Sequence, residues 1–230
     1  MRRITAASLA LAALVTAGTS AFLVPKASAE ELKFFDPSTK RWISYRPSRA
    51  ALAEERRKKF ARREVPIDTK QPAGTVIVDT NARYLYLVEG DGKAMRYGIG
   101  VGREGFRWSG QEKISRKAEW PGWTPPAEMV ARQPDLPRYM PGGPGNPLGA
   151  RAFYLGSTLY RIHGSNEPWT IGEAVSSGCI RMVNDDVIDL YDRVPVGSRV
   201  VVIGPGKDSS EIYTETTQTA DSAGKTAKAL

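Results

Sequence analysis

Apolar residues in the middle of the chain occur in short runs separated by turn residues, which is the pattern of a β-rich domain. Residues 75–80 form a β-branched apolar run, and residues 82–102 contain two more runs around the turn EGDG at 89–92. Both faces of segment 84–88 are apolar, which predicts a strand buried on both sides. Strand character returns in two later segments, 151–164 and 198–204.

Two other segments have features of helices. Residues 184–194 begin with Asn184, a good N-cap, and continue with two acidic residues that suit the positive end of a helix dipole. Their apolar residues share one helical face: Val187, Leu190, Tyr191 and Val194. Residues 50–64 are strongly charged and have few apolar positions, which predicts a solvated helix rather than a membrane-binding one.

These elements divide the chain beyond its N-terminal segment into three parts. We expect a lead-in at 30–73 with the charged helix, a main domain at 74–204, and a disordered tail at 205–230. Within the main domain, residues 121–149 are rich in Pro and Gly, and so long a loop usually packs against a functional site. The main domain is therefore predicted to be mainly β, a sandwich or barrel-like fold with one or two short helices.

The chain begins with the pattern of a secretory signal peptide, residues 1–29. Two arginines precede an apolar run at 4–24, which is followed by the cleavage pattern Ala27-Ser28-Ala29. We expect cleavage before Glu30 and export to the periplasm or cell wall. An uncleaved membrane anchor is the alternative, because the run is nearly long enough to span a bilayer, but its many small residues favour cleavage.

Net charge restricts the partners of the exported protein. The chain of 230 residues has a formal charge of +8, and loss of the signal peptide removes Arg2, Arg3 and Lys26, which leaves +5. A basic exported protein associates with anionic surfaces such as cell-wall polymers. The sequence contains no nucleic-acid-binding motif, and we expect no stable membrane insertion once the signal peptide is gone.

One cysteine and one histidine, Cys179 and His163, lie sixteen positions apart in a dense stretch of the chain. A single cysteine cannot form an internal disulfide, so Cys179 is an intermolecular bridge, a buried small residue or a reactive thiol. Imidazole is the side chain best suited to remove a thiol proton near neutral pH. We therefore interpret Cys179 as a nucleophile and His163 as its base, the alternative for His163 being an ordinary, partly buried imidazole.

The turn before Cys179 suits acyl transfer without a metal. Ser177 and Gly178 are small, so backbone N–H groups here, including that of Cys179, can approach a substrate and form an oxyanion hole. Zinc sites need three or four ligands, and a site with one Cys and one His would require two carboxylates at a suitable spacing. No such spacing is found, so we expect neither a metal nor another cofactor.

Two further side chains are candidates for substrate binding. In an extended strand, Arg181 lies on the same side as Cys179, where it would lower the thiol pKa or hold a substrate carboxylate. The alternative for Arg181 is a salt bridge to Asp185 or Asp186. Trp169 lies between the histidine and the cysteine in sequence and is the best aromatic candidate for the wall of a groove.

The segment from His163 to Ser176-Ser177-Gly178-Cys179-Ile180-Arg181 resembles the L,D-transpeptidase (YkuD-type) catalytic domain of bacterial cell-wall enzymes. The signature of that family is a histidine, a dozen or more residues, and then Ser-x-Gly-Cys-aliphatic-Arg or Asn. Further similarity covers essentially residues 74–204. The chain departs from many members at Ser177, where they carry a second histidine.

This resemblance implies a β-rich fold with Cys179 in a groove as nucleophile. It implies that His163 acts first as general base and then as general acid, with the carbonyl of Gly164 orienting its ring. The substrates would be peptidoglycan stem peptides. Cys179 would attack the third residue of a tetrapeptide stem and release D-alanine, and an amine of a second stem would resolve the thioester to give a 3–3 cross-link.

Other outcomes remain open at the level of sequence. Water could resolve the thioester, which would make the protein an L,D-carboxypeptidase or another hydrolase. An amine of an envelope protein could be the acceptor, which would attach that protein to peptidoglycan. A wall-binding module without turnover is the alternative outside the enzymes, and the intact cysteine–histidine pair argues against it because binding needs neither residue.

Overall fold

The computed structural model describes residues 32–36, 41–45 and 48–216, in two units that divide after Pro47. In the first unit, strands β1 (Leu32–Asp36) and β2 (Arg41–Tyr45) form an antiparallel hairpin. The expected signal peptide, residues 1–29, lies outside the described residues. Among the residues that are described, no helix is long and apolar enough to cross a membrane.

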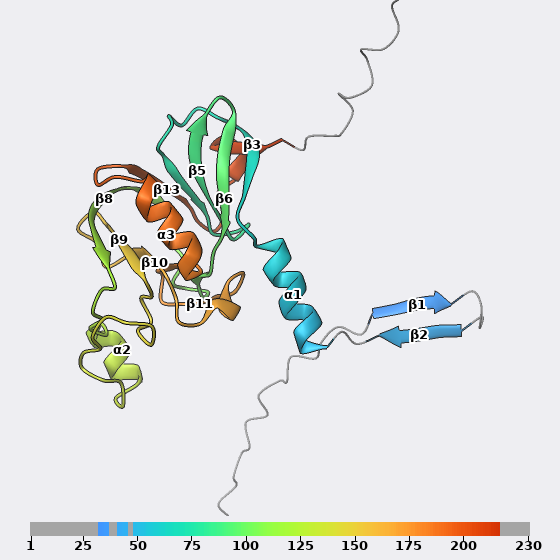
Figure 1. Cartoon of the computed structure of the whole chain (residues 1–230), viewed down its shortest axis with the longest axis horizontal. Helices are drawn as coiled ribbons and strands as arrows, with labels where there is room; N and C mark the ends of the chain where they lie inside the picture. Colours follow the sequence, from blue (N-terminus) through green and yellow to red (C-terminus); the bar gives the residue numbers. More distant parts are fainter. Residues whose placement is uncertain (1–31, 37–40, 46–47, 217–230) are drawn as a thin grey trace, which may run out of the picture. The chain divides into compact units, whose positions relative to one another are not determined.

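The second unit is built on a ten-stranded mixed sheet (Figure 1). Its strands are β3 (Arg63–Thr69), β4 (Val76–Asp79), β5 (Tyr84–Gly90), β6 (Lys93–Gly98), β8 (Gly110–Glu119), β9 (Arg151–Leu155), β10 (Arg161–His163), β12 (Ile180–Arg181), β13 (Arg199–Ile203) and β14 (Tyr213–Glu215). They lie in the order β12-β10-β9-β8-β13-β4-β5-β6-β3-β14. Only the β4/β13 and β10/β12 pairs are parallel among these strands. The prediction of a mainly β fold is confirmed.

The centre of the sheet is buried on both faces, as the sequence pattern predicts. Successive side chains of a strand point to opposite faces, so Leu85 and Leu87 enter one apolar cluster while Tyr86 and Val88 enter a second. Burial of a side chain of this size stabilises the fold by roughly 1.5–3 kcal/mol. This double burial anchors the middle of the sheet, from which the strands that carry the site extend.

Helix α3 (Asn184–Arg193) packs against β9 and covers one face of the sheet (Figure 1). Val187 and Leu190 are fully buried in the same cluster as Leu85. The predicted helix at 184–194 and its apolar face are therefore confirmed. A small parallel sheet of β7 (Val101–Gly102) and β11 (Ala174–Ser176) leads into the segment that contains Cys179.

Helix α1 (Arg49–Lys59) is shorter than the predicted segment 50–64. The helix ends where Phe60 packs against Gly98 and Gly172, and a Cβ added to these glycines would lie only 2.4 and 2.1 Å from Phe60 atoms. The chain then enters β3, whose buried Val65 and Ile67 alternate with less buried residues. The sheet therefore includes residues that the sequence pattern placed in the lead-in.

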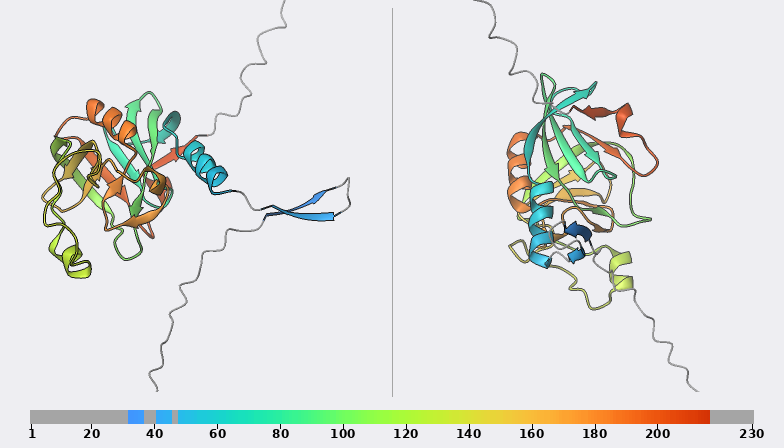
Figure 2. Two further views of the ribbon diagram at one scale, coloured as in Figure 1. Left: turned by 60° about the horizontal axis from the view of Figure 1, so that its bottom comes forward. Right: turned by 90° about the vertical axis from the view of Figure 1, so that its right-hand side faces the viewer.

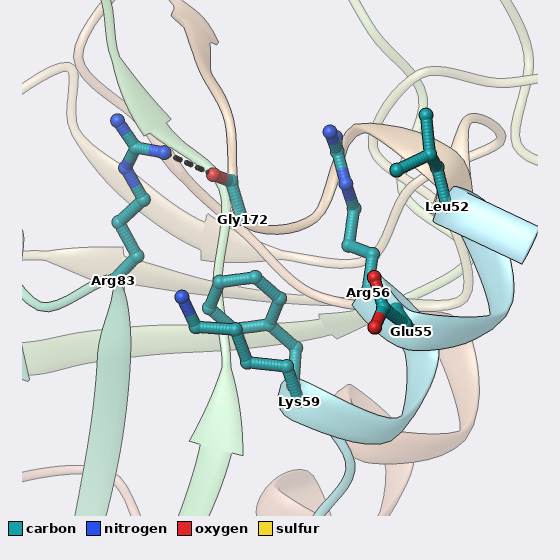
Figure 3. Close-up of a pocket in the computed structure, with 7 residues that line it drawn as sticks. Leu52, Glu55, Arg56, Lys59, Arg83 and Gly172 are labelled. Atoms are coloured by element: carbon teal, nitrogen blue, oxygen red, sulfur yellow. Dashed lines mark hydrogen bonds between the residues drawn. The ribbon is translucent and has the colours of Figure 1, made fainter. Parts of the chain in front are cut away.

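The end of α1 is fixed to the segment between His163 and Cys179. Arg56 pairs with Glu173 and also donates to the Trp169 carbonyl. Beside this contact is an open cavity of about 450 Å³ into which Lys59 projects, and on whose far side Arg83 donates to the carbonyl of Gly172 (Figure 3). Helix α1 thus holds the segment between His163 and Cys179 through these contacts.

Three further elements lie where the sequence pattern predicted none. The loop at 121–149 contains a third helix, α2 (Ala127–Arg132), which has no buried residue and projects from the end of the sheet in each view (Figures 1 and 2). The expected tail includes a short 3₁₀ turn at Ser209–Glu211 and strand β14, which pairs with β3. The buried Arg96 fixes β14 through Glu215, at 2.6 Å. Residues 217–230 lie outside the described residues.

Candidate active site

The parallel strands β10 and β12 bring the histidine and cysteine segments together. Their register pairs Ile162 with Ile180 and His163 with Arg181. Both isoleucines are buried in the core, so the side chains that alternate with them point to the opposite face. Cys179 precedes β12 by one residue, which places it on that face, and it lines one cleft of about 910 Å³ together with His163 and Arg181.

His163 is held in the form of a base. Its Nδ1 lies 2.6 Å from the carbonyl oxygen of Gly164, which accepts a hydrogen bond and thereby assigns the ring proton to Nδ1 and leaves Nε2 free. Burial lowers the pKa of His163 to about 4, the hydrogen bond to Gly164 opposes this change, and the nearby charges of Arg181 and Arg161 add to it. The imidazole is therefore neutral at pH 7.

Asn184 supports the peptide that orients His163. Its Oδ1 accepts hydrogen bonds from the N–H groups of Ala150, at 3.0 Å, and Ser165, at 3.3 Å. A Cβ on either Gly149 or Gly164 would lie 2.3 Å from this oxygen, so only glycine fits at both places. The sequence assigned Asn184 to the N-cap of α3, but the N-cap is Val183. The N-cap prediction was wrong because the Asn184 side chain instead accepts hydrogen bonds from the two loops beside His163.

Cys179 is a neutral thiol in this setting. Its Sγ lies 3.9 Å from the carbonyl oxygen of Leu159. Burial raises the pKa of the Cys179 thiol, while the backbone N–H and the positive charge of Arg161 oppose that rise. A neutral thiol is a weak nucleophile, so a base must remove its proton as it attacks.

The turn before Cys179 allows one backbone N–H to face a substrate. Gly178 has a φ of +105°, and a Cβ there would lie 2.6 Å from the ring of Tyr160, so glycine is required. Its own N–H donates to Ser176 Oγ, at 3.2 Å, and Ser177 lines the cleft. None of the hydrogen bonds found among the described residues uses the N–H of Cys179, so this group is the better oxyanion donor.

The two predicted substrate-binding side chains differ in their relation to the cleft. Arg181 lines the cleft, but its Nη2 lies 2.7 Å from Glu167 Oε2 and 2.9 Å from Ser165 Oγ, and not against Asp185 or Asp186. Its charge is thus paired. Trp169 is 65% exposed on the 3₁₀ turn Pro168–Thr170 and is not among the residues that line the cleft.

Tyr160 and Arg161 line the cleft and were given no role from the sequence, whereas the long loop at 121–149 was expected to pack against a site. Tyr160 stacks on Trp108, with ring centroids 4.5 Å apart, and Trp108 Nε1 donates to the Gly178 carbonyl. The Pro- and Gly-rich loop supplies an apolar wall: Trp123, Pro126, Met129 and Leu136. Its length was the one sequence signal for that role. Arg161 also lines the cleft, two residues before His163 on the same strand; it lies within the segment of family resemblance, but the sequence assigned it no role.

Metal-assisted chemistry has no apparent ligand set in this cleft. Within ranges 32–36, 41–45 and 48–216, no group of three or more His, Cys, Asp or Glu residues could hold a metal ion. The groups at hand for chemistry are a thiol, a neutral imidazole and backbone N–H donors. These are the components of cysteine-dependent acyl transfer.

Comparison with known proteins finds relatives for the domain that holds this cleft. A family model described as the L,D-transpeptidase catalytic domain, YkuD, matches residues 73–202. Probable L,D-transpeptidase YbiS of Escherichia coli K12 is 40% identical over 148 residues, which are 60% of this chain and 47% of that protein. Probable L,D-transpeptidase ErfK/SrfK of the same strain is 40% identical over 56% of this chain and 43% of its own length.

One solved structure, from Brucella melitensis and described as a probable carnitine operon oxidoreductase, is 47% identical to this chain. The match covers 66% of this chain and 99% of that one, with a TM-score of 0.44. The matches to YbiS and ErfK/SrfK cover only part of those proteins. This chain spans a little under half the length of those curated relatives.

Proposed function

The chain belongs to the YkuD family of L,D-transpeptidase catalytic domains, and we propose that it is a peptidoglycan L,D-transpeptidase that forms 3–3 cross-links through a thioester on Cys179. The observation that carries this proposal is the placement of the one cysteine and the one histidine of the chain in a single cleft. Both lie on the same face of the parallel pair β10 and β12. Binding alone requires neither residue, whereas acyl transfer requires both.

In the acylation step, the thiol of Cys179 attacks the carbonyl carbon of the third residue of a tetrapeptide stem. His163 Nε2 takes the thiol proton as the S–C bond forms, and the negative charge that develops on the carbonyl oxygen is stabilised by the N–H of Cys179. The imidazolium then gives this proton to the amide nitrogen as the C–N bond breaks. D-alanine leaves, and the stem remains on the sulfur as a thioester.

In the second step, an amine on the third residue of another stem attacks the thioester. His163, neutral again, accepts the proton of that amine and returns it to the sulfur as the S–C bond breaks. The product is an amide between the third residues of two stems. Water in place of the amine would give hydrolysis, and an amine of an envelope protein would give attachment of that protein.

The surroundings of the pair suit a substrate that carries carboxylates. Four cationic and two anionic side chains line the cleft: Arg103, Arg132, Arg161, Arg181, Glu128 and Glu167. This excess of positive charge favours an acidic peptide such as a stem of peptidoglycan. The signal-peptide pattern at residues 1–29 supports export to the compartment that holds this substrate.

Product analysis tests this proposal. The mature chain is incubated with a purified disaccharide-tetrapeptide, and the products are separated and identified by mass spectrometry, with Cys179→Ala as the matched control. We expect dimers joined between their third residues together with free D-alanine, and neither from the control. Release of D-alanine without dimers would identify a hydrolase, and no change in the substrate with folded protein would contradict the proposal.

A further inference from the structure

Arg161 places a positive charge beside the reactive sulfur. The parallel register that pairs Ile162 with Ile180 brings Arg161 and Cys179 side by side, one residue earlier on each segment. Alternation along the strand puts the Arg161 side chain on the same face as His163, and it lines the cleft with Cys179. The guanidinium therefore faces the space where the attacked part of a substrate must lie.

The cations of the cleft differ in their partners, and the Arg161 guanidinium lies 5.2 Å from the centroid of the Tyr154 ring. Arg181 is paired with Glu167, and the guanidinium groups of Arg103 and Arg132 lie over the ring of Phe106, at 4.4 and 5.5 Å. Arg161 makes no ion pair among the residues the structure describes, and its buried Nε has no hydrogen-bond partner there. A buried donor of this kind is costly unless a ligand satisfies it.

The chemistry of the donor peptide indicates what that ligand is. When Sγ attacks the carbonyl carbon of the third residue, the carboxylate of the residue that leaves is three bonds beyond that carbon, roughly 3–4 Å away. A guanidinium next to the sulfur can reach a group at that distance. Arginine and carboxylate form paired, charge-assisted hydrogen bonds whose geometry is specific.

We propose that Arg161 binds the terminal carboxylate of the donor stem, the carboxylate of the residue that leaves, and so selects peptides that end one residue beyond the attacked carbonyl. This inference rests on the proposed function. Arg161 would then determine specificity for the C-terminal end of the donor peptide. A stem longer by one residue places a neutral amide at this position and moves the carboxylate about 3–4 Å farther, so Arg161 stays unpaired.

Two synthetic stems that differ only at the C-terminus test the inference. One tetrapeptide carries the free carboxylate and the other a primary amide, and the rate of acylation of Cys179 by each is followed by intact-protein mass spectrometry. We expect the wild-type protein to prefer the free acid by about 10- to 100-fold, the effect of one charge-assisted interaction. Arg161→Gln is expected to lose this preference, so that the ratio of the two rates falls toward one. A loss of rate common to both peptides would report the effect of the Arg161 charge on the Cys179 thiol, and the ratio is therefore the quantity compared.

Two variants complete the comparison. Arg161→Lys keeps the charge and is expected to retain most of the preference. Arg116→Gln is the matched control, because the Arg116 guanidinium lies 3.5 Å from the Tyr154 ring centroid, over the ring that Arg161 also approaches, but does not line the cleft. It is expected to leave the preference unchanged. Arg161→Met, which keeps the aliphatic stem, replaces Arg161→Gln if circular dichroism shows that the glutamine variant is unfolded.

Binding to the Cys179→Ala variant, measured by calorimetry, separates this inference from the proposed function. Tighter binding of the acid than of the amide, lost in Cys179→Ala/Arg161→Gln, supports the role of Arg161 even if the wild-type protein is not acylated, in which case the proposed function fails alone. Equal binding of the two peptides, binding of neither, or an equal loss of rate with both peptides in Arg161→Gln overturns the inference.

Discussion

Replacing Asn184 by alanine removes the oxygen that accepts hydrogen bonds from two backbone N–H groups beside His163. Ala150 and Ser165, which donate these groups, are both buried, so the substitution leaves two buried donors without their protein acceptor. An unsatisfied buried donor costs about 1–3 kcal/mol. Taking about 2 kcal/mol for the bond at 3.0 Å and about 1 kcal/mol for the longer bond at 3.3 Å, we expect a loss of about 3 kcal/mol in the free energy of unfolding.

Asn184→Asp is the matched variant, because it keeps an acceptor oxygen in a side chain of the same shape. Its negative charge also lies in the first turn of α3, where the helix dipole favours it. We expect this variant to lose less than about 1 kcal/mol. Urea unfolding followed by tryptophan fluorescence gives both values, with the slope of the transition as a check that the unfolded states are comparable.

The same substitution is expected to affect turnover, because Asn184 contacts the peptide whose carbonyl orients His163. A small displacement of the Gly164 carbonyl misaligns Nε2 without changing the walls of the cleft. We therefore expect Asn184→Ala to lower kcat by about 10-fold or more at an unchanged KM. A free energy of unfolding within about 0.5 kcal/mol of the wild-type value, or equal losses in the alanine and aspartate variants, would refute this reasoning.

Three further predictions concern the site and the sheet. The folded pKa of His163, about 4, is below its ordinary value of 6.5, so the unfolded state binds more protons between these two pH values. In urea titrations, the wild-type protein should therefore lose stability relative to His163→Gln as pH falls from 6.5 to 4. Parallel plots of unfolding free energy against pH for the two proteins would argue against a neutral buried imidazole. Gly178→Ala should reduce kcat/KM at least 10-fold, since its Cβ would meet the Tyr160 ring and its φ is positive; wild-type kinetics would show that the turn tolerates a side chain. Glu215→Ala should destabilise the fold by about 3 kcal/mol by leaving the buried Arg96 unpaired, and an unchanged thermal midpoint would mean that β14 contributes little.

The elements that the sequence pattern predicts correctly are those whose stabilisation is local or whose pattern is unambiguous. Strands β4 to β6 have apolar runs around a tight turn, and α3 has an apolar face with acidic residues at its start. Strands β3 and β14 were missed because their pairing joins segments that are far apart in the chain, a relation that local periodicity does not contain. Helix α2 is six residues long and has no buried residue, so its sequence shows no repeating apolar face.

The residues of the site also differ in whether the sequence alone could predict them. The cysteine and the histidine could be predicted because each type occurs once and their chemistry is complementary. The partner of Arg181 could not, because Glu167 approaches it only through the fold of the intervening segment. Arg161 stands beside Cys179 only through a parallel register between two short strands, and such a register cannot be read from either strand by itself.

The central claim is that Cys179 forms a thioester with the donor stem, and intact-protein mass spectrometry of the mature chain tests it most directly. The protein is mixed with a purified tetrapeptide stem, beside the Cys179→Ala variant, and stopped in acid before the acceptor step completes. We predict a mass increase that equals the stem without its terminal D-alanine, absent from the variant. A folded wild-type protein with a reduced thiol and no such adduct, or an adduct that persists in Cys179→Ala, would contradict the mechanism.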